Sequence, residues 1–232
     1  MDEWIDDSDR DSPTALVLAD PSAVAAINRS EVMVQLDAAH KYSRSIKRFM
    51  GTSITLATIN VATAESCMYS LPRGGKSITG PSVRLAEIMA SAYGNLHIGA
   101  RVVDIGDREV TAQGIAWDLE TNLRVTVEVQ RRITDKSGKR FNDDMINVTC
   151  AAACSIALRN AIFRVVPRAY VDQVYERCRN VAIGNASTLT QRRDDVLGRL
   201  AKMGADKDRV LNALKLKGVE DIGLEHLELL IG

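Results

Sequence analysis

Residues 97–133 decide the fold class, and they read HIGARVVDIGDREVTAQGIAWDLETNLRVTVEVQRRI. Apolar residues alternate with polar ones and turn residues interrupt them, a pattern that predicts strands joined by tight turns. The predicted strands are His97–Ile105, Glu109–Leu119 and Leu123–Ile133. Every second residue from Val125 to Val129 is valine, which is typical of a sheet with one packed and one solvated face. We therefore expect an antiparallel β-meander.

Positive charge gathers directly after the meander. Asp135–Gly138 supply a turn, and Lys139–Phe141 are expected to return as a short edge strand. The basic residues of this hairpin are Arg131, Arg132, Lys136, Lys139 and Arg140. Ten residues thus carry five positive charges, which indicates a surface that attracts phosphate.

A long helix is predicted next. Asn142 or Asp143 caps it, and it runs from about Asp144 to Val166. The side chains at positions 150–155 are small, so we expect this helix to lie unusually close to a sheet or to another helix. A further helix is expected over Arg168–Val181.

The chain before the meander predicts three helices and a loop. Apolar residues recur at helical spacing from Val32 to Met50. Ser53–Leu71 is rich in Thr and Ala, and its length favours a second helix that ends at Pro72. A glycine-rich loop, Arg73–Gly80, precedes a third helix over Pro81–Tyr93.

Composition suggests a core with two flanking segments. Residues 1–20 contain seven acids and one arginine, and we expect this segment to be disordered. Residues 21–184 form the predicted core. Residues 185–232 begin with a small-residue linker and hold three short helices, expected to fold as a small interaction domain. The predicted class is α+β, a β-meander packed against helices with a small C-terminal helical domain.

Several function classes lack support in the sequence. The N-terminus is acidic, unlike a signal peptide, and no apolar run approaches the length of a membrane helix, so we expect a cytoplasmic protein with no membrane contact. The four cysteines form no C-x-x-C pair, and the three histidines are far apart in the sequence, so neither a metal nor a cofactor is expected. No nucleophile and base are grouped, which argues against an enzyme.

Two functional motifs, one for phosphate binding and one for a nuclease, are incomplete in this sequence. Gly75-Lys76-Ser77 resembles part of a phosphate-binding P-loop, but Ser70 stands where the first glycine is required. Arg73 and Lys76 could still hold a DNA phosphate, or the loop could be a plain surface connection. A D…E-x-K nuclease could use Asp104 and Glu128 as its acids, but it would need a lysine two residues after Glu128, where the chain has Gln130.

The remaining signal is a groove of positive charge. Arg159, Arg164 and Arg168 follow on the helix expected beside the basic hairpin. Together with the hairpin they would attract a nucleic-acid backbone independently of its base sequence. We therefore predict DNA contacts at Arg73, Lys76, Arg131, Arg132, Lys136, Lys139, Arg140, Arg159, Arg164 and Arg168.

The order of these elements over about 45–170 resembles the phage single-strand annealing proteins, the ERF, RecT and Red-beta group. The final core helix of that group reads A-x-x-x-A-L-x-x-A with basic residues, and Ala153, Ala157, Leu158, Arg159 and Ala161 match it. The turn Asp135-Lys136-Ser137-Gly138 is similar to the one that precedes that helix. Pro167 stands where the group often has a glycine-containing turn.

The resemblance implies binding of single-stranded DNA and annealing of complementary strands without ATP, in homologous recombination and DNA repair. It also implies a homo-oligomer, as a ring or a helical filament, and a partner such as a host single-strand-binding protein or an exonuclease. Two alternatives stay open: a phage nuclease with a divergent metal site, and a structural or regulatory oligomer without a catalytic or DNA role.

Overall fold

The structure is a computed structural model that describes residues 21–73, 76–184 and 188–231. It is an α+β fold with two small antiparallel sheets. The α+β class and the three-stranded sheet are as predicted, whereas the two-stranded sheet is not expected from the sequence. The acidic segment 1–20, for which disorder is predicted, lies outside the described residues.

The predicted meander is confirmed. Its strands are β3 (Leu96–Ile105), β4 (Glu109–Asp118) and β5 (Leu123–Arg132), in the order β3-β4-β5. Alternate residues of β4, from Val110 to Asp118, are buried beneath a helix, whereas the residues between them, such as Trp117, face the other side. The predicted edge strand at 139–141 is reduced to one isolated bridge between Thr134 and Arg140.

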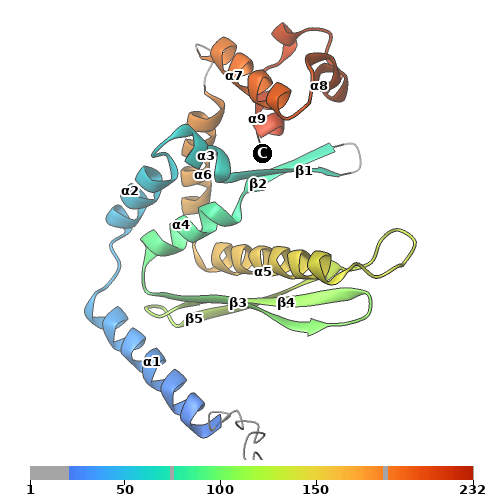
Figure 1. Ribbon diagram of the computed structural model, residues 1–232. Helices are drawn as coiled ribbons and strands as arrows, with labels where there is room; N and C mark the ends of the chain where they lie inside the picture. The colour runs from blue at the N-terminus through green and yellow to red at the C-terminus, as the bar shows by residue number, and fades with distance from the viewer. Residues whose placement is uncertain (1–20, 74–75, 185–187, 232) are drawn as a thin grey trace, which may run out of the picture.

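The helix against the sheet is α5 (Asp143–Val165), and it packs as closely as its small residues predict. Asn142 caps it, because the Asn142 side chain accepts a hydrogen bond from the Met145 amide. Gly114 on β4 faces Ala157 so closely that a Cβ added at Gly114 would meet the backbone of α5. Figure 1 shows α5 between the three-stranded sheet and a separate hairpin.

The predicted helix over 32–50 is two helices. These are α1 (Pro21–Lys41) and α2 (Ile46–Ala57). The chain breaks at Arg44, whose guanidinium donates to both carboxylate oxygens of Asp118 (2.8 and 3.0 Å) and lies 3.5 Å from the centre of the Tyr93 ring. Apolar periodicity continues across the break, and therefore the pattern alone does not reveal it.

The predicted helix over Ser53–Leu71 is wrong. After α2 come a short helix, α3 (Val61–Ser66), and a two-stranded hairpin of β1 (Met68–Arg73) and β2 (Lys76–Pro81). The glycine-rich stretch is thus the end of a hairpin, in which Pro72 is tolerated because the sheet has only two strands. Helix α4 (Val83–Tyr93) starts after Pro81, with Ser82 as its N-cap.

The chain after α5 is helical, as predicted. Its elements are α6 (Arg168–Ile183), α7 (Leu189–Lys202), α8 (Lys207–Leu214), a 3₁₀ turn (Val219–Asp221) and α9 (Leu224–Ile231). Buried Leu197, Ile222 and Leu227 belong to the same apolar core as Leu85 and Met89 of α4. The division into a core and a separate C-terminal domain stays a prediction.

Two helices have unusual exposure or composition. Helix α1 extends away from the body (Figure 1) and exposes Val24, Ile27 and Val34. Helix α5 is, among the described helices, the one long and apolar enough to cross a membrane. A packed core helix has the same composition, and α5 contacts all three strands of the meander.

Candidate nucleic-acid interface

The structure separates the predicted basic residues into two clusters. Arg131 and Arg132 end β5, and the other three hairpin residues lie in the loop before α5. Arg159 stands sixteen residues beyond Asp143 on α5, which is about 24 Å along the helix axis. Arg164 lies in the last turn of α5, and Arg168 begins α6.

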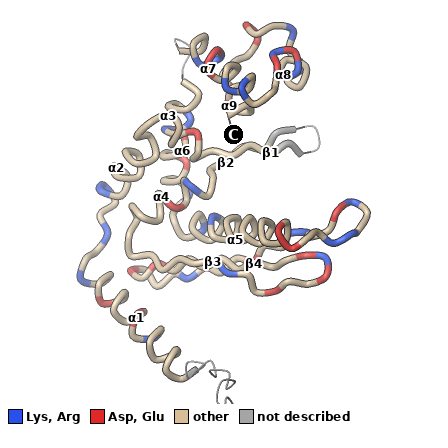
Figure 2. The backbone as a smooth tube through the Cα atoms, viewed as in Figure 1, with Lys and Arg blue, Asp and Glu red and all other residues tan. Residues whose placement is uncertain are grey.

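The loop cluster is balanced by acids at the same end of the sheet. Six basic residues, Arg108, Arg131, Arg132, Lys136, Lys139 and Arg140, accompany six acidic ones, Asp104, Asp107, Glu109, Asp135, Asp143 and Asp144. Figure 2 shows both colours together at these turns. The Arg140 guanidinium is also committed to the turn of β3 and β4, since it donates to the Gly106 carbonyl (2.6 Å). Strong attraction of a polyanion is therefore not expected from this end.

A recess of about 390 Å³ brings the other cluster together with aromatic side chains. It opens where the β1–β2 hairpin meets the α5–α6 junction. Its lining residues are Tyr69, Pro81, Arg159, Asn160, Phe163, Arg164 and Arg168. Three arginines and no acid line the recess, so its local charge is positive. The neighbouring Asp172 forms an exposed ion pair with Arg168 (2.7 Å), which a phosphate could replace at little cost.

The contact between Tyr69 and Arg159 is the centre of the recess. The Arg159 guanidinium carbon lies 4.9 Å from the centre of the Tyr69 ring, a cation–π distance. The same guanidinium donates two hydrogen bonds to the Asn160 side-chain oxygen (3.2 and 3.1 Å). Gly80 pairs with Tyr69 across the hairpin, and a Cβ there would stand only 3.0 Å from the ring. The glycine thus leaves room for the ring to lie across the strand.

Exposed surfaces continue from the recess toward the hairpin tip. Leu71 pairs with Ile78 two residues beyond Tyr69, so both share its side of the hairpin, and they are 59% and 45% exposed. On α5, Ser155 and Val148 recur at helical spacing from Arg159, and Val148 is 62% exposed. These two faces are apolar or small, and they extend the charged recess with flat, uncharged surface.

Arg73 and Lys76 pair as the last residues before the hairpin turn. Their side chains, and the turn residues Gly74 and Gly75, lie outside the described residues. The flanking elements are two antiparallel strands, whereas a P-loop joins a strand to a helix. The elements that flank Gly74 and Gly75 therefore differ from those of a P-loop.

The carboxylates considered for a nuclease do not face each other. Glu128 is opposite Gln113, which hydrogen-bonds to it (3.4 Å), and Asp104 is opposite Thr111. Among the described residues, no three His, Cys, Asp or Glu side chains are grouped as metal ligands.

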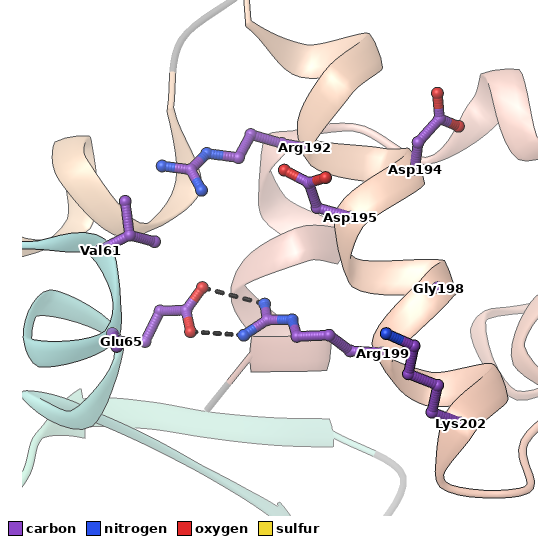
Figure 3. A pocket seen from close by; sticks show the side chains of 9 residues that line it. Val61, Glu65, Arg192, Asp194, Asp195, Gly198, Arg199 and Lys202 are labelled. Carbon is purple, nitrogen blue, oxygen red and sulfur yellow. Dashed lines mark hydrogen bonds and ion pairs between the residues drawn. The ribbon is translucent and has the colours of Figure 1, made fainter.

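A larger pocket, about 500 Å³, lies between α3 and α7 (Figure 3). Arg199 reaches across it to both carboxylate oxygens of Glu65 (2.6 and 2.9 Å), and Arg192 donates to the Val181 carbonyl (2.8 Å). Acidic and basic lining residues are equal in number, so the pocket has no net charge to attract an anion. It is a less suitable nucleic-acid site than the recess.

No protein-family model, no curated protein and no solved structure matches this chain.

Tyr69 and Phe163 are recess residues that sequence reasoning missed. The sequence pattern places Tyr69 in the predicted helix over Ser53–Leu71, where it has no functional role. The sequence does contain an indication of a hairpin. Two short stretches of strand length flank Gly74-Gly75, a dipeptide typical of a tight hairpin turn. Phe163 had no signal, because only the fold brings it to the same recess as the hairpin.

Proposed function

We propose that the chain binds single-stranded DNA at the recess and anneals complementary strands without a nucleotide cofactor. The observation that carries the proposal is the arrangement of three arginines around Tyr69 and Phe163, next to uncharged exposed faces. Phosphates would lie against Arg164 and Arg168, where charge is exposed. Bases would stack on the aromatic rings, an interaction that tolerates any base sequence.

The same arrangement favours a single strand over a duplex. In a duplex the bases are already stacked and paired, so a ring that lines a recess reaches only the backbone. The exposed stripe on α5 from Val148 to Arg159 spans about 17 Å. At about 3.4 Å per nucleotide, that length accommodates about five nucleotides.

The proposal includes assembly into a homo-oligomer, as a ring or a helical filament. The exposed apolar residues of α1 support it, since a helix that leaves the body with Val24, Ile27 and Val34 uncovered gains by packing against another copy. A continuous row of recesses would hold a strand extended while its bases test a second strand. The expected partners, a host single-strand-binding protein or an exonuclease, and the cytoplasmic location belong to this proposal.

The experiment compares two matched triple variants by fluorescence anisotropy with a labelled oligothymidine. Arg159→Gln/Arg164→Gln/Arg168→Gln removes the recess charges, and Arg131→Gln/Lys136→Gln/Lys139→Gln removes the same number from the loop cluster. Binding by the wild type should weaken with salt at a slope of about 0.7 per phosphate contact. The recess variant should show a shallower slope, with affinity lower by about ten- to a thousandfold at low salt.

The loop variant should change much less than the recess variant. Equal losses in both variants would mean that only net charge matters, which contradicts a defined site. Wild-type binding that does not respond to salt would refute the phosphate contacts. Magnesium-dependent degradation of the oligonucleotide would favour a nuclease, and absence of binding at any salt would favour a structural oligomer.

A further inference from the structure

The β1–β2 hairpin has a supported face opposite the recess. Residues alternate along β1, so Met68 and Ser70 lie on the side away from Tyr69, and Met68 is buried. Helices α9 and α6 both contact this hairpin, and α9 contacts β1 as well as β2. The C-terminal segment therefore lies directly behind one wall of the recess.

An ion pair whose carboxylate is buried joins α9 to α6 beside the hairpin. Glu228 of α9 is only 8% exposed. Arg179 of α6 donates to both its carboxylate oxygens, from Nε to Oε1 (2.9 Å) and from Nη2 to Oε2 (2.7 Å). The Tyr175 hydroxyl donates a third, longer hydrogen bond to Oε1 (3.5 Å). Burial, together with the Glu228 charge, raises the pKa of Tyr175 to about 12, so this donor stays protonated.

The hairpin depends on such support. A two-stranded sheet is marginally stable on its own, and needs a helix or further strands behind it. Its front face, with Leu71 and Ile78, is exposed rather than packed on α5. The position of Tyr69 against Arg159 is consequently determined from behind, by α6 and α9.

We propose that the Arg179–Glu228 ion pair is a positioning element of the recess: it holds α9 behind the hairpin and thereby sets Tyr69 at its distance from Arg159. The consequence of this inference, that the ion pair tunes affinity for single-stranded DNA, rests on the proposed function. It gives the C-terminal helices a role in supporting the binding surface, beside the interaction role expected from the sequence.

The chain offers a matched control for testing the pair. Glu65 and Arg199 form a second bidentate ion pair, between α3 and α7, and the Glu65 side chain is 13% exposed against 11% for Glu228. Glu228→Gln and Glu65→Gln each remove one carboxylate from such a pair, but only the first lies behind the hairpin. Hydrogen exchange of the full chain, followed by mass spectrometry, reports on peptides that cover residues 68–81.

Glu228→Gln should speed exchange in the hairpin by about 10- to 100-fold, the range that corresponds to losing charge-assisted hydrogen bonds. It should also weaken oligothymidine binding. Glu65→Gln should leave both the hairpin exchange and the affinity close to the wild type. Because Glu228→Gln leaves the half-buried Arg179 with only its exposed partner Glu176, Arg179→Gln/Glu228→Gln provides a second variant in which neither charge of the pair remains. It should loosen the hairpin in the same way.

Equal hairpin exchange in the Glu228 and Glu65 variants would overturn the proposal, as would unchanged affinity in a variant whose hairpin exchange has increased. The two ideas fail separately. If the wild type binds no single-stranded DNA, the proposed function fails, whereas hairpin-specific exchange still supports the positioning of Tyr69. If the wild type binds but the hairpin does not loosen, only the positioning role is refuted.

Discussion

Replacing Gly114 with alanine is expected to separate α5 from the sheet and to destabilise the whole fold. A Cβ at this position would stand 2.7 Å from the Leu158 nitrogen, and closer still to the Ala157 carbonyl. Ordinary contacts of a Cβ begin at 3.4 Å, so the helix must move by at least about 0.7 Å. The opposing atoms are backbone, and they cannot rotate away as a side chain would.

The magnitude follows from two opposing effects. Overpacking a well-packed core costs about 1–3 kcal/mol, and a backbone clash belongs to the upper part of that range. Removing a glycine from a strand returns about 0.5–1 kcal/mol of conformational entropy. The net loss is about 1–2 kcal/mol in the free energy of unfolding, which for a chain of this length lowers Tm by about 2–8 °C.

Gly99→Ala is the control, because Gly99 lies in the neighbouring strand β3 and a Cβ there meets nothing within 4 Å. Thermal unfolding followed by circular dichroism should show a lower Tm for Gly114→Ala and none of this loss for Gly99→Ala. Since Arg159 follows Ala157 by two residues, the Gly114 variant should also bind single-stranded DNA less tightly. A Gly114 variant as stable as the wild type would refute the close approach of α5 to β4.

Three further outcomes are expected. Tyr69→Leu should lower affinity for oligothymidine by about 5- to 150-fold, the equivalent of one lost base stack. Tyr42→Leu, at an exposed site, should not lower it. Equal affinities of the two variants in anisotropy titrations would remove Tyr69 from the site. Burial opposes the charge of Asp118, but hydrogen bonds, chiefly from Arg44, hold the pKa of this carboxyl below its usual range. The ionised Asp118 therefore stabilises the fold fully above about pH 4, and this stabilisation is lost as the pH falls through the lowered pKa. Asp118→Asn should therefore have a lower Tm than the wild type at pH 7, with the difference shrinking toward pH 2; a constant difference would contradict the ion pair. Deleting residues 1–20, which contain seven acids and one arginine, should raise affinity for single-stranded DNA at low salt and lose that effect at high salt; an effect that persists at high salt would mean a direct contact rather than charge.

The meander and the helix on it could be predicted from local pattern alone. The valines of β5 alternate without interruption, and the small residues of α5 match a close approach that Gly114 then permits. Each of these features depends on neighbours in the sequence. That is why both the strand order and the closeness of the helix were predictable.

The errors occur where distant contacts decide the local structure. The break between α1 and α2 is held by Arg44 and Asp118, which are 74 residues apart. The sequence predicts a helix where the first strand of the hairpin lies, because this strand follows a Thr- and Ala-rich stretch whose polarity does not alternate. The recess itself joins Tyr69 to Arg159 only after α6 and α9 pack behind β1, so the sequence predicted its charges but not its aromatic centre.

Photo-crosslinking tests the central claim most directly, since it identifies the residues that touch bases. An oligonucleotide carrying 5-iododeoxyuridine is bound to the full chain, irradiated and digested, and the attached peptides are identified by mass spectrometry. The predicted crosslinks are at Tyr69 and Phe163, and those at Tyr69 disappear in Tyr69→Leu. Crosslinks confined to the loop at 131–140, or to Trp117 on the open face of the sheet, would contradict the recess as the binding site.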